Sequence, residues 1–316
     1  MKGHNSLKKK ITRIISVVLF IALLIGGIEV LGEVLRPVNT DIVFNAIDSF
    51  HSMPEESIEV LCCGSSRMWR GLDTMEMNRK YGLAAYNYGS NWQKINTTEL
   101  FLDDALRTQS PKVVLIEASR INKVLQDSDV NGEIYCTRGL PESKEKKRYL
   151  EQCFGDDSDR WLSYYVPLFL AHENWDSLEM GHLFRNKEDP DYAGTMGFNA
   201  TYESVSVQYL DPSRVKQKEL RLTSVQVLDR IVETCRENGA SLVFYTSPCA
   251  TKVSYSDAMK QYAAEHGCTY LNLMENLDEI GIDPQTDFAD KKHLNAQGAG
   301  KVADYLGKYI TEHYDV

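Results

Sequence analysis

The sequence predicts an α/β fold: a doubly wound, mainly parallel five-stranded sheet with a large, partly helical insertion and an N-terminal transmembrane helix. Three observations lead to this prediction. Short apolar runs of β-forming residues alternate with helical patterns, a stretch of about 95 residues interrupts the alternation, and a long apolar run follows a basic N-terminus. With 316 residues, 43% of them hydrophobic, the chain can bury a substantial core, which excludes a disordered, collagen-like or disulfide-stapled protein.

The first 36 residues have the charge pattern of a membrane anchor. Basic residues precede an uncharged apolar run from Ile14 to Ile28, and mostly apolar residues continue to Leu35. Because about 20 apolar residues span a bilayer core, Arg13 and Glu29 are expected at the two membrane interfaces. No small-x-small cleavage site follows, so we expect an uncleaved anchor rather than a removed signal peptide. The basic end should stay in the cytoplasm, which predicts a single-pass protein of the cell membrane with residues from 37 onward outside the cytoplasm.

The rest of the composition excludes several kinds of partner. The formal net charge is −10, and the N-terminal segment is basic, so the remainder is more acidic still and would repel a phosphate backbone. We therefore expect no nucleic acid partner. The seven cysteines show neither CxxC nor Cys/His ligand spacing, so no metal and no cofactor is expected. One or two disulfides are compatible with the count, and the sequence does not pair them.

Beyond a connector over residues 37–57, the pattern of one domain extends over residues 58–316. Its strands are predicted to be short and continuously apolar, as in a sheet that is covered on both faces. A helical pattern runs from Leu222 to Cys235, and the final helix is predicted to begin at about Asn295. The five predicted strands are Ile58–Cys63, Ala84–Tyr88, Val113–Ile116, Ser241–Thr246 and Thr269–Leu273.

The alternation of strands and helices stops between about residues 121 and 216. A structureless loop of this length is improbable in a compact domain, so we predict an insertion with helical pieces at Lys144–Leu150 and Trp161–Ala171. The insertion is rich in Trp and Tyr. These rings could stack on sugars or pack a small core of the insertion itself, and the composition leaves both alternatives open.

A glycine-serine turn follows the first predicted strand. Gly64 allows a sharp turn, which would expose the next side chains at the sheet edge and place Ser66 close to backbone N–H groups. The G-x-S-x-G elbow of α/β-hydrolases is absent, because Met68 occupies the position of its last glycine. An ordinary surface turn explains this segment equally simply when it is considered alone.

An Asp-x-x-His motif precedes the final predicted helix. Asp290 and His293 are three residues apart, so on one helical turn the carboxylate would hold one ring nitrogen. The other nitrogen would then be free to accept a proton from a serine hydroxyl. Alone, this motif is also compatible with a solvated turn.

Together, the Gly-Ser-Ser turn after the first strand and Asp-x-x-His-Leu-Asn before the last helix resemble the SGNH (GDSL-like) hydrolase superfamily, from about Ile58 to the C-terminus. The resemblance implies the flavodoxin-like SGNH fold. It also implies a catalytic triad in which Ser66 is the nucleophile, His293 the general base and Asp290 the residue that orients His293.

The middle motifs of that superfamily match less well. Asn87-Tyr88-Gly89-Ser90-Asn91-Trp92 follows the second strand, and the resemblance makes Gly89, or alternatively Trp92, an oxyanion donor. The usual Gly-x-Asn-Asp block is replaced by Ile116-Glu117-Ala118-Ser119-Arg120, so its asparagine is missing. Asn91 would either substitute for it or stabilise a turn. Glu117 and Arg120 would either pair with each other or face the substrate.

The missing block, the anchor and the outward domain resemble the membrane-anchored branch of the superfamily, which includes the teichoic acid D-alanyl transfer protein and polysaccharide O-acyltransferase-type proteins. This implies an extracytoplasmic serine esterase or O-acyltransferase that acts on acyl esters of a cell-surface polysaccharide or teichoic acid-like polymer. The sequence leaves open whether a multispanning acyl-donor protein works with it. The alternative is a non-catalytic, membrane-tethered binding or scaffold module in cell-wall assembly.

Overall fold

The computed structural model describes residues 2–36, 41–91, 93–124, 137–183, 194–209 and 214–316. Its contacts divide the chain into two compact units. Unit 1 contains Met1–Asp41 and Phe154–Glu188, and unit 2 contains Ile42–Cys153 and Asp189–Val316. The predicted strands and the predicted site residues all belong to unit 2.

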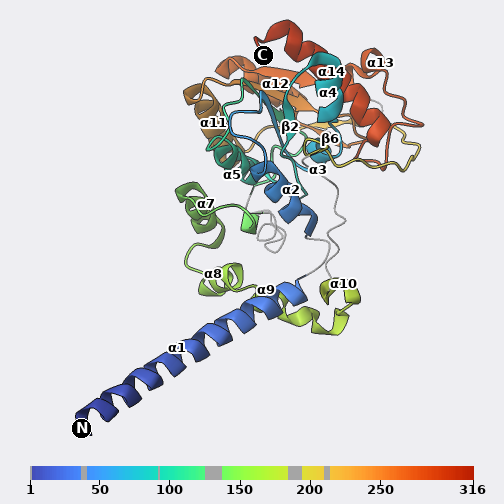
Figure 1. The fold of residues 1–316 in the computed structure, drawn as a ribbon. Coiled ribbons are helices and arrows are strands. Elements are labelled where there is room, and N and C mark those ends of the chain that lie inside the picture. Colours follow the sequence, from blue (N-terminus) through green and yellow to red (C-terminus); the bar gives the residue numbers. More distant parts are fainter. Residues whose placement is uncertain (1, 37–40, 92, 125–136, 184–193, 210–213) are drawn as a thin grey trace. The chain divides into compact units, whose positions relative to one another are not determined.

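Unit 2 is built on the predicted five-stranded parallel sheet, with strand order β2-β1-β3-β5-β7 (Figure 1). All pairings between neighbouring strands of this sheet are parallel, so the carboxyl ends of the strands meet at one edge. The α/β fold class is confirmed, and each strand lies within two residues of its predicted bounds. The strands are β1 Val60–Cys63, β2 Ala85–Asn87, β3 Val113–Glu117, β5 Ser241–Thr246 and β7 Thr269–Asn272.

Helices cover both faces of this sheet, which is why its central strands are apolar throughout. On one face α4 (Thr74–Tyr81) packs against α14 (Ala296–His313), and residues of β1, β3 and β5 share a core with both helices. On the other face α5 (Ile95–Ala105) and α11 (Leu222–Glu237) pack together and contact β1 and β5 (Figure 1). Asn295 caps α14 through a 3.1 Å bond from Gly298 N–H, as the sequence predicts.

Shorter elements complete unit 2. A small parallel pair joins β4 to β6, away from the main sheet. The remaining elements are α3 Ser66–Trp69, α7 Lys144–Phe154, α12 Ser256–His266, α13 Leu277–Ile280, the 3₁₀ helix η5 Leu273–Glu275, β4 Lys216–Gln217 and β6 Val253–Ser254. Helix α7 covers the predicted helical piece at residues 144–150.

The segment expected as a connector contains helix α2 (Asp41–His51), which belongs largely to unit 2. Its apolar residues recur at helical spacing, and Val43, Ile47 and Phe50 are buried. Phe50 stacks on Tyr88 with ring centroids 4.0 Å apart. An isolated helix of 11 residues is only marginally stable in water, so α2 depends on such tertiary contacts for its stability.

Unit 1 consists of α1 (Lys2–Leu35) together with α8 (Ser158–Tyr165), α9 (Pro167–Ala171), the 3₁₀ helix η3 (His172–Ser177) and α10 (Met180–Leu183). Residues Lys9–Leu35 are long and apolar enough to cross a membrane, with a mean hydropathy of 2.8. The helical piece predicted at residues 161–171 is present but divided, because Pro167 cannot donate to the preceding turn and begins a new helix.

The cysteines are mainly core residues. Cys62, Cys63, Cys235 and Cys249 are buried, and burial raises the pKa of each of these thiols. Cys136 lies outside the described residues, and Cys62, Cys63, Cys235, Cys249 and Cys268 are free thiols.

Candidate active site

The turn after β1 places Ser66 at the carboxyl edge of the sheet. Gly64 has a φ of 153°, and a Cβ atom there would lie 3.0 Å from the Cβ atoms of both Glu117 and Met68. Glycine is therefore required by the close approach of neighbouring segments as well as by the backbone. The Ser65 side chain accepts a 3.4 Å bond from Arg67 N–H, so α3 begins at Ser66.

Asp290 and His293 lie in a short loop that enters α14. Phe288 and Leu294 form an isolated antiparallel bridge, which brings the two ends of the loop together. Asp290 Oδ1 accepts bonds from the N–H groups of Lys292 at 2.7 Å and His293 at 3.1 Å. The loop is thus a turn capped by the Asp290 carboxylate, and the expected helical turn is not formed.

The fold brings Ser66, His293 and Asp290 into one hydrogen-bonded chain. Ser66 Oγ lies 2.8 Å from His293 Nε2, and His293 Nδ1 lies 2.8 Å from Asp290 Oδ2. A carboxylate at Nδ1 requires that nitrogen to carry the proton, so Nε2 is left to accept the Ser66 hydroxyl proton. This is the order of contacts that a nucleophile, a base and an orienting carboxylate need.

Burial and neighbouring charges shift the pKa values of His293 and Asp290. Burial lowers the pKa of His293 below its ordinary 6.5, and Arg70 and Arg67 lower it further, which outweighs the opposing effect of Asp290. Burial alone would raise the pKa of Asp290, but hydrogen bonds from the His293 ring and from Lys292 N–H hold it below its usual value. At neutral pH, His293 is therefore neutral and Asp290 ionised, as proton transfer from serine requires.

A fully buried carboxylate supports the His293 loop. Asp287 has no exposed surface, and its Oδ2 atom accepts bonds from Lys301 Nζ at 2.6 Å and Asp283 N–H at 2.7 Å. Its backbone carbonyl accepts from Asn295 N–H at 3.0 Å. Asp287 thus fixes the start of the loop to the first turns of α14.

Backbone N–H groups around Ser66 are the candidate oxyanion donors. Ser66 N–H is the first amide of α3, and the described residues offer it no hydrogen-bond acceptor. Gly89 N–H, in contrast, donates to Asn87 Oδ1 at 3.1 Å, so it is engaged within its own turn and is not a free donor. The Asn91 carbonyl accepts from Ser90 Oγ at 3.2 Å, and Trp92 lies outside the described residues.

Glu117, at the carboxyl end of β3, is hydrogen-bonded to two neighbouring turns. Its side chain is buried and accepts from Ser119 N–H at 3.0 Å, Ser119 Oγ at 2.8 Å and Ser247 N–H at 3.3 Å. The carboxylate therefore ties the turn after β3 to the turn after β5. Arg120 interacts electrostatically with Glu117, but burial and the like charge of Arg67 lower the pKa of its guanidinium.

Two amide side chains that the sequence did not single out hold the turn that carries Ser66. Asn87 Nδ2 donates at 2.9 Å to the carbonyls of both Met68 and Leu72, which fixes α3 against the end of β2. Gln93 Oε1 accepts from Gly64 N–H at 3.2 Å. A polar residue at the carboxyl end of a buried strand was the available signal for Asn87, whereas nothing in the local sequence marks Gln93.

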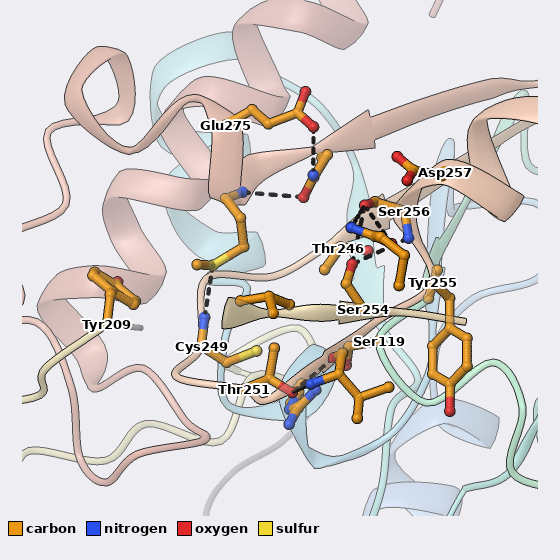
Figure 2. Close-up of a pocket in the computed structure, with 17 residues that line it drawn as sticks. Ser119, Tyr209, Thr246, Cys249, Thr251, Ser254, Tyr255, Ser256, Asp257 and Glu275 are labelled. Atoms are coloured by element: carbon orange, nitrogen blue, oxygen red, sulfur yellow. Dashed lines mark hydrogen bonds between the residues drawn. The ribbon is translucent and has the colours of Figure 1, made fainter. Parts of the chain in front are cut away.

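A cavity of about 180 Å³ lies at the carboxyl edge of the sheet, and Ser66, His293 and Asp290 are not among the residues that line it (Figure 2). Arg67, the residue after Ser66, lines it, and further lining residues come from the carboxyl ends of β3, β5 and β7. Hydroxyl and amide groups predominate, and the Tyr209 hydroxyl is buried without a hydrogen-bond partner among the described residues. The polar lining includes Ser119, Gln217, Thr246, Thr251, Ser254, Ser256 and Asn272.

Comparisons with known proteins place this chain far from characterised relatives. No protein-family model matches the chain, and no curated protein sequence matches it. Among solved structures, it is similar to a Bacteroides fragilis protein described as a "putative acylhydrolase", with 11% identity and a TM-score of 0.41 over 84% of this chain and 94% of that chain. At this distance, the geometry of the site itself has to carry the functional argument.

Proposed function

We propose that the protein is an extracytoplasmic serine esterase or O-acyltransferase that acts on acyl esters of a cell-surface polysaccharide or teichoic acid-like polymer. The observation that carries the proposal is the hydrogen-bonded chain from Ser66 Oγ through the His293 ring to Asp290 Oδ2, with both distances at 2.8 Å. Burial and two nearby arginines lower the pKa of His293, so the neutral ring is available to accept the Ser66 proton near neutral pH.

In the first half-reaction, Ser66 Oγ attacks the ester carbonyl carbon while His293 Nε2 accepts the hydroxyl proton. The carbon–oxygen bond to the alcohol then breaks, and the imidazolium returns that proton to the departing alkoxide. The product is an acyl-Ser66 ester and a free alcohol. Asp290 stabilises the imidazolium and keeps the ring in the orientation that the reaction needs.

Negative charge that develops on the carbonyl oxygen needs hydrogen-bond donors. Ser66 N–H is suitable because it belongs to the attacking residue and has no acceptor among the described residues. A preorganised donor of this kind contributes about 3 kcal/mol to the barrier reduction. Arg67 and Arg120 add positive charge at the same edge of the sheet.

The second half-reaction decides between the two activities. Water as the acceptor makes an esterase, whereas a sugar or polyol hydroxyl makes a transferase. The cavity that Arg67 lines favours a polyhydroxylated group, because its serine, threonine and amide side chains can exchange hydrogen bonds with hydroxyl groups (Figure 2). An anchoring helix would raise the concentration of the site near polymers at the membrane surface.

A non-catalytic binding module is the alternative, and one observation favours it. Gly89 N–H is already engaged and the third-block asparagine is absent, so the oxyanion site has one identified donor among the described residues. A protein that only binds acylated glycans would keep the cavity but would not need an activated serine.

The decisive experiment is labelling of the full-length protein in detergent micelles with a fluorophosphonate probe. We expect covalent labelling that is lost in both Ser66→Ala and His293→Ala. The matched control is Ser49→Ala, which removes a partly buried serine of α2 that does not line the cavity. Labelling that persists in Ser66→Ala, or no labelling of the folded wild-type chain, would favour the binding module. Mass spectrometry of acyl esters incubated with glycan acceptors then separates transfer from hydrolysis.

A further inference from the structure

The helices of residues 158–183 pack on the end of the apolar helix α1. Contacts join α9, η3 and α10 to α1 (Figure 1). At Gly32 the approach is so close that a Cβ atom would lie 2.7 Å from Leu168 N and from Pro167 Cβ. Asn174 Nδ2 donates to the Leu35 carbonyl at 3.2 Å, which satisfies one of the terminal carbonyls of α1. Through these contacts, α1 and the short helices pack together as one compact unit.

The side chains of α1 are exposed along most of the helix and become buried where the short helices pack against it. From residue 9 to residue 27 the described side chains are exposed, with values such as 77% for Leu23, whereas Gly32, Leu35 and Arg36 are buried. The uncharged run of α1 ends at Ile28, so Glu29 marks the expected outer boundary of the bilayer core. At about 1.5 Å per residue, Gly32 and Leu35 lie within about 9 Å beyond Glu29, at the level of the lipid headgroups.

The short helices present large apolar side chains to the outside at this level. Trp175 is 70% exposed, Met180 67% and Phe169 51%. We call the following exposed residues the apolar collar: Leu162, Tyr165, Phe169, Trp175, Leu178, Met180 and Leu183. A soluble domain rarely exposes so many apolar and aromatic side chains on adjoining short segments. Aromatic rings are, in contrast, the side chains that favour the region between lipid tails and headgroups.

The charge of the same segment restricts what can cover it. Arg160 is the one Lys or Arg between residues 158 and 183, whereas Asp159, Glu173, Asp176 and Glu179 are acidic. Electrostatic attraction to anionic lipids is therefore excluded as the driving force. Insertion of apolar side chains into a zwitterionic interface needs no such attraction.

From these observations we propose that the apolar collar lies in the lipid interface around the outer end of α1, as a second membrane contact beside the spanning helix. The inference rests on α1 crossing a membrane and is independent of the chemistry proposed for Ser66. A collar of this kind would limit the tilt and rotation of α1 at the membrane surface.

The test uses tryptophan fluorescence of the full-length chain in phosphatidylcholine nanodiscs that contain one chain each. The lipids are brominated either next to the headgroup or at the chain ends, because bromine quenches only nearby rings. Bromine next to the headgroup should quench the tryptophan fluorescence of the wild type clearly more than that of Trp175→Phe. Bromine at the chain ends should quench the fluorescence of both proteins to the same degree. The contribution of Trp175 should also be protected from aqueous iodide and unchanged by high salt.

A second variant moves the tryptophan probe to another position of the apolar collar, so that the test does not depend on Trp175 alone. In the Trp175→Phe background, Met180→Trp should restore headgroup-proximal quenching, because Met180 belongs to the same exposed surface. Equal lipid quenching of wild type and Trp175→Phe, together with full access of Trp175 to iodide, would overturn the proposal. That outcome would leave the collar open to a protein partner or a second copy of the chain. The quenching result does not depend on whether a fluorophosphonate labels Ser66. Either proposal can therefore fail without the other.

Discussion

His293 Nε2 lies 2.8 Å from Ser66 Oγ although the two residues are 227 positions apart in the chain. Each residue is held by local features, Ser66 by the Gly64 turn and the cap of α3, and His293 by the Asp290 turn. The contact itself depends on β1 lying between β2 and β3 in the sheet and on α14 packing over the same sheet.

Replacing Asp290 tests the orienting role of its carboxylate. Asp290→Asn keeps the size of the side chain but removes the charge that holds the proton on His293 Nδ1. We expect kcat for hydrolysis of a p-nitrophenyl ester to fall by about 10³–10⁴-fold with an unchanged circular dichroism spectrum. Asp278→Asn, at an exposed position on α13, is the control and should keep full activity. An unaltered kcat in Asp290→Asn would contradict the triad.

The pH dependence of kcat/KM should report the lowered pKa of His293. Because only the neutral ring accepts the Ser66 proton, activity should rise with pH to a plateau, with a midpoint below the ordinary 6.5. Arg70 is one of the charges that lower this pKa, so Arg70→Met should move the midpoint to higher pH. Arg79→Met on α4 serves as the control, and a midpoint that stays fixed in Arg70→Met would refute the assigned cause.

Two glycines of α14 should respond oppositely to alanine. A Cβ at Gly298 would lie 2.4 Å from the Asp287 carbonyl, so Gly298→Ala should displace the loop that carries His293, lowering both Tm and kcat. Gly300 has open space around its Cβ position, and Gly300→Ala should stabilise the helix by about 0.5–1 kcal/mol. Thermal unfolding of the two variants measures the difference. Equal Tm values for both would show that the Asp287 contact is not tight.

Asp103 on α5 should make stability depend on pH. Burial and the nearby charge of Glu99 raise its pKa from 3.8 to about 7, although Arg148 opposes the change. The folded chain therefore binds the proton more tightly than the unfolded chain, and this contribution to the free energy of unfolding is lost as the pH rises from about 4 to about 7.

Asp103→Asn removes that ionisation. We expect its Tm to exceed that of the wild type at about pH 8 and the difference to shrink at about pH 5, where Asp103 is protonated in the folded chain. Asp48→Asn, at an exposed position on α2, should show no such pattern. A Tm difference that is independent of pH would mean that Asp103 is ionised throughout this range.

Local patterns predicted a large part of this protein. Strands such as Val113–Glu117 were identifiable because residues covered on both faces must be apolar in sequence, without knowledge of their partners. Asn295 was identifiable as a helix cap because capping involves residues only a few positions apart. The break at Pro167 and the helix in residues 41–51 were not predicted. The apolar residues of that helix are buried by contacts with distant residues such as Tyr88, and a local pattern does not show such contacts.

The sequence by itself determined the α/β class, the strand positions and the residue types at Ser66, Asp290 and His293, since each depends on patterns within a few residues. Only the tertiary structure decided that Asn87 Nδ2 bonds the carbonyls of Met68 and Leu72 and that Glu117 joins the turns after β3 and β5. It also revealed the buried supports at Gln93 and Asp287. A hydrogen bond between distant segments depends on distance and direction in space, and these are set by the packing of the whole domain, which no local spacing encodes.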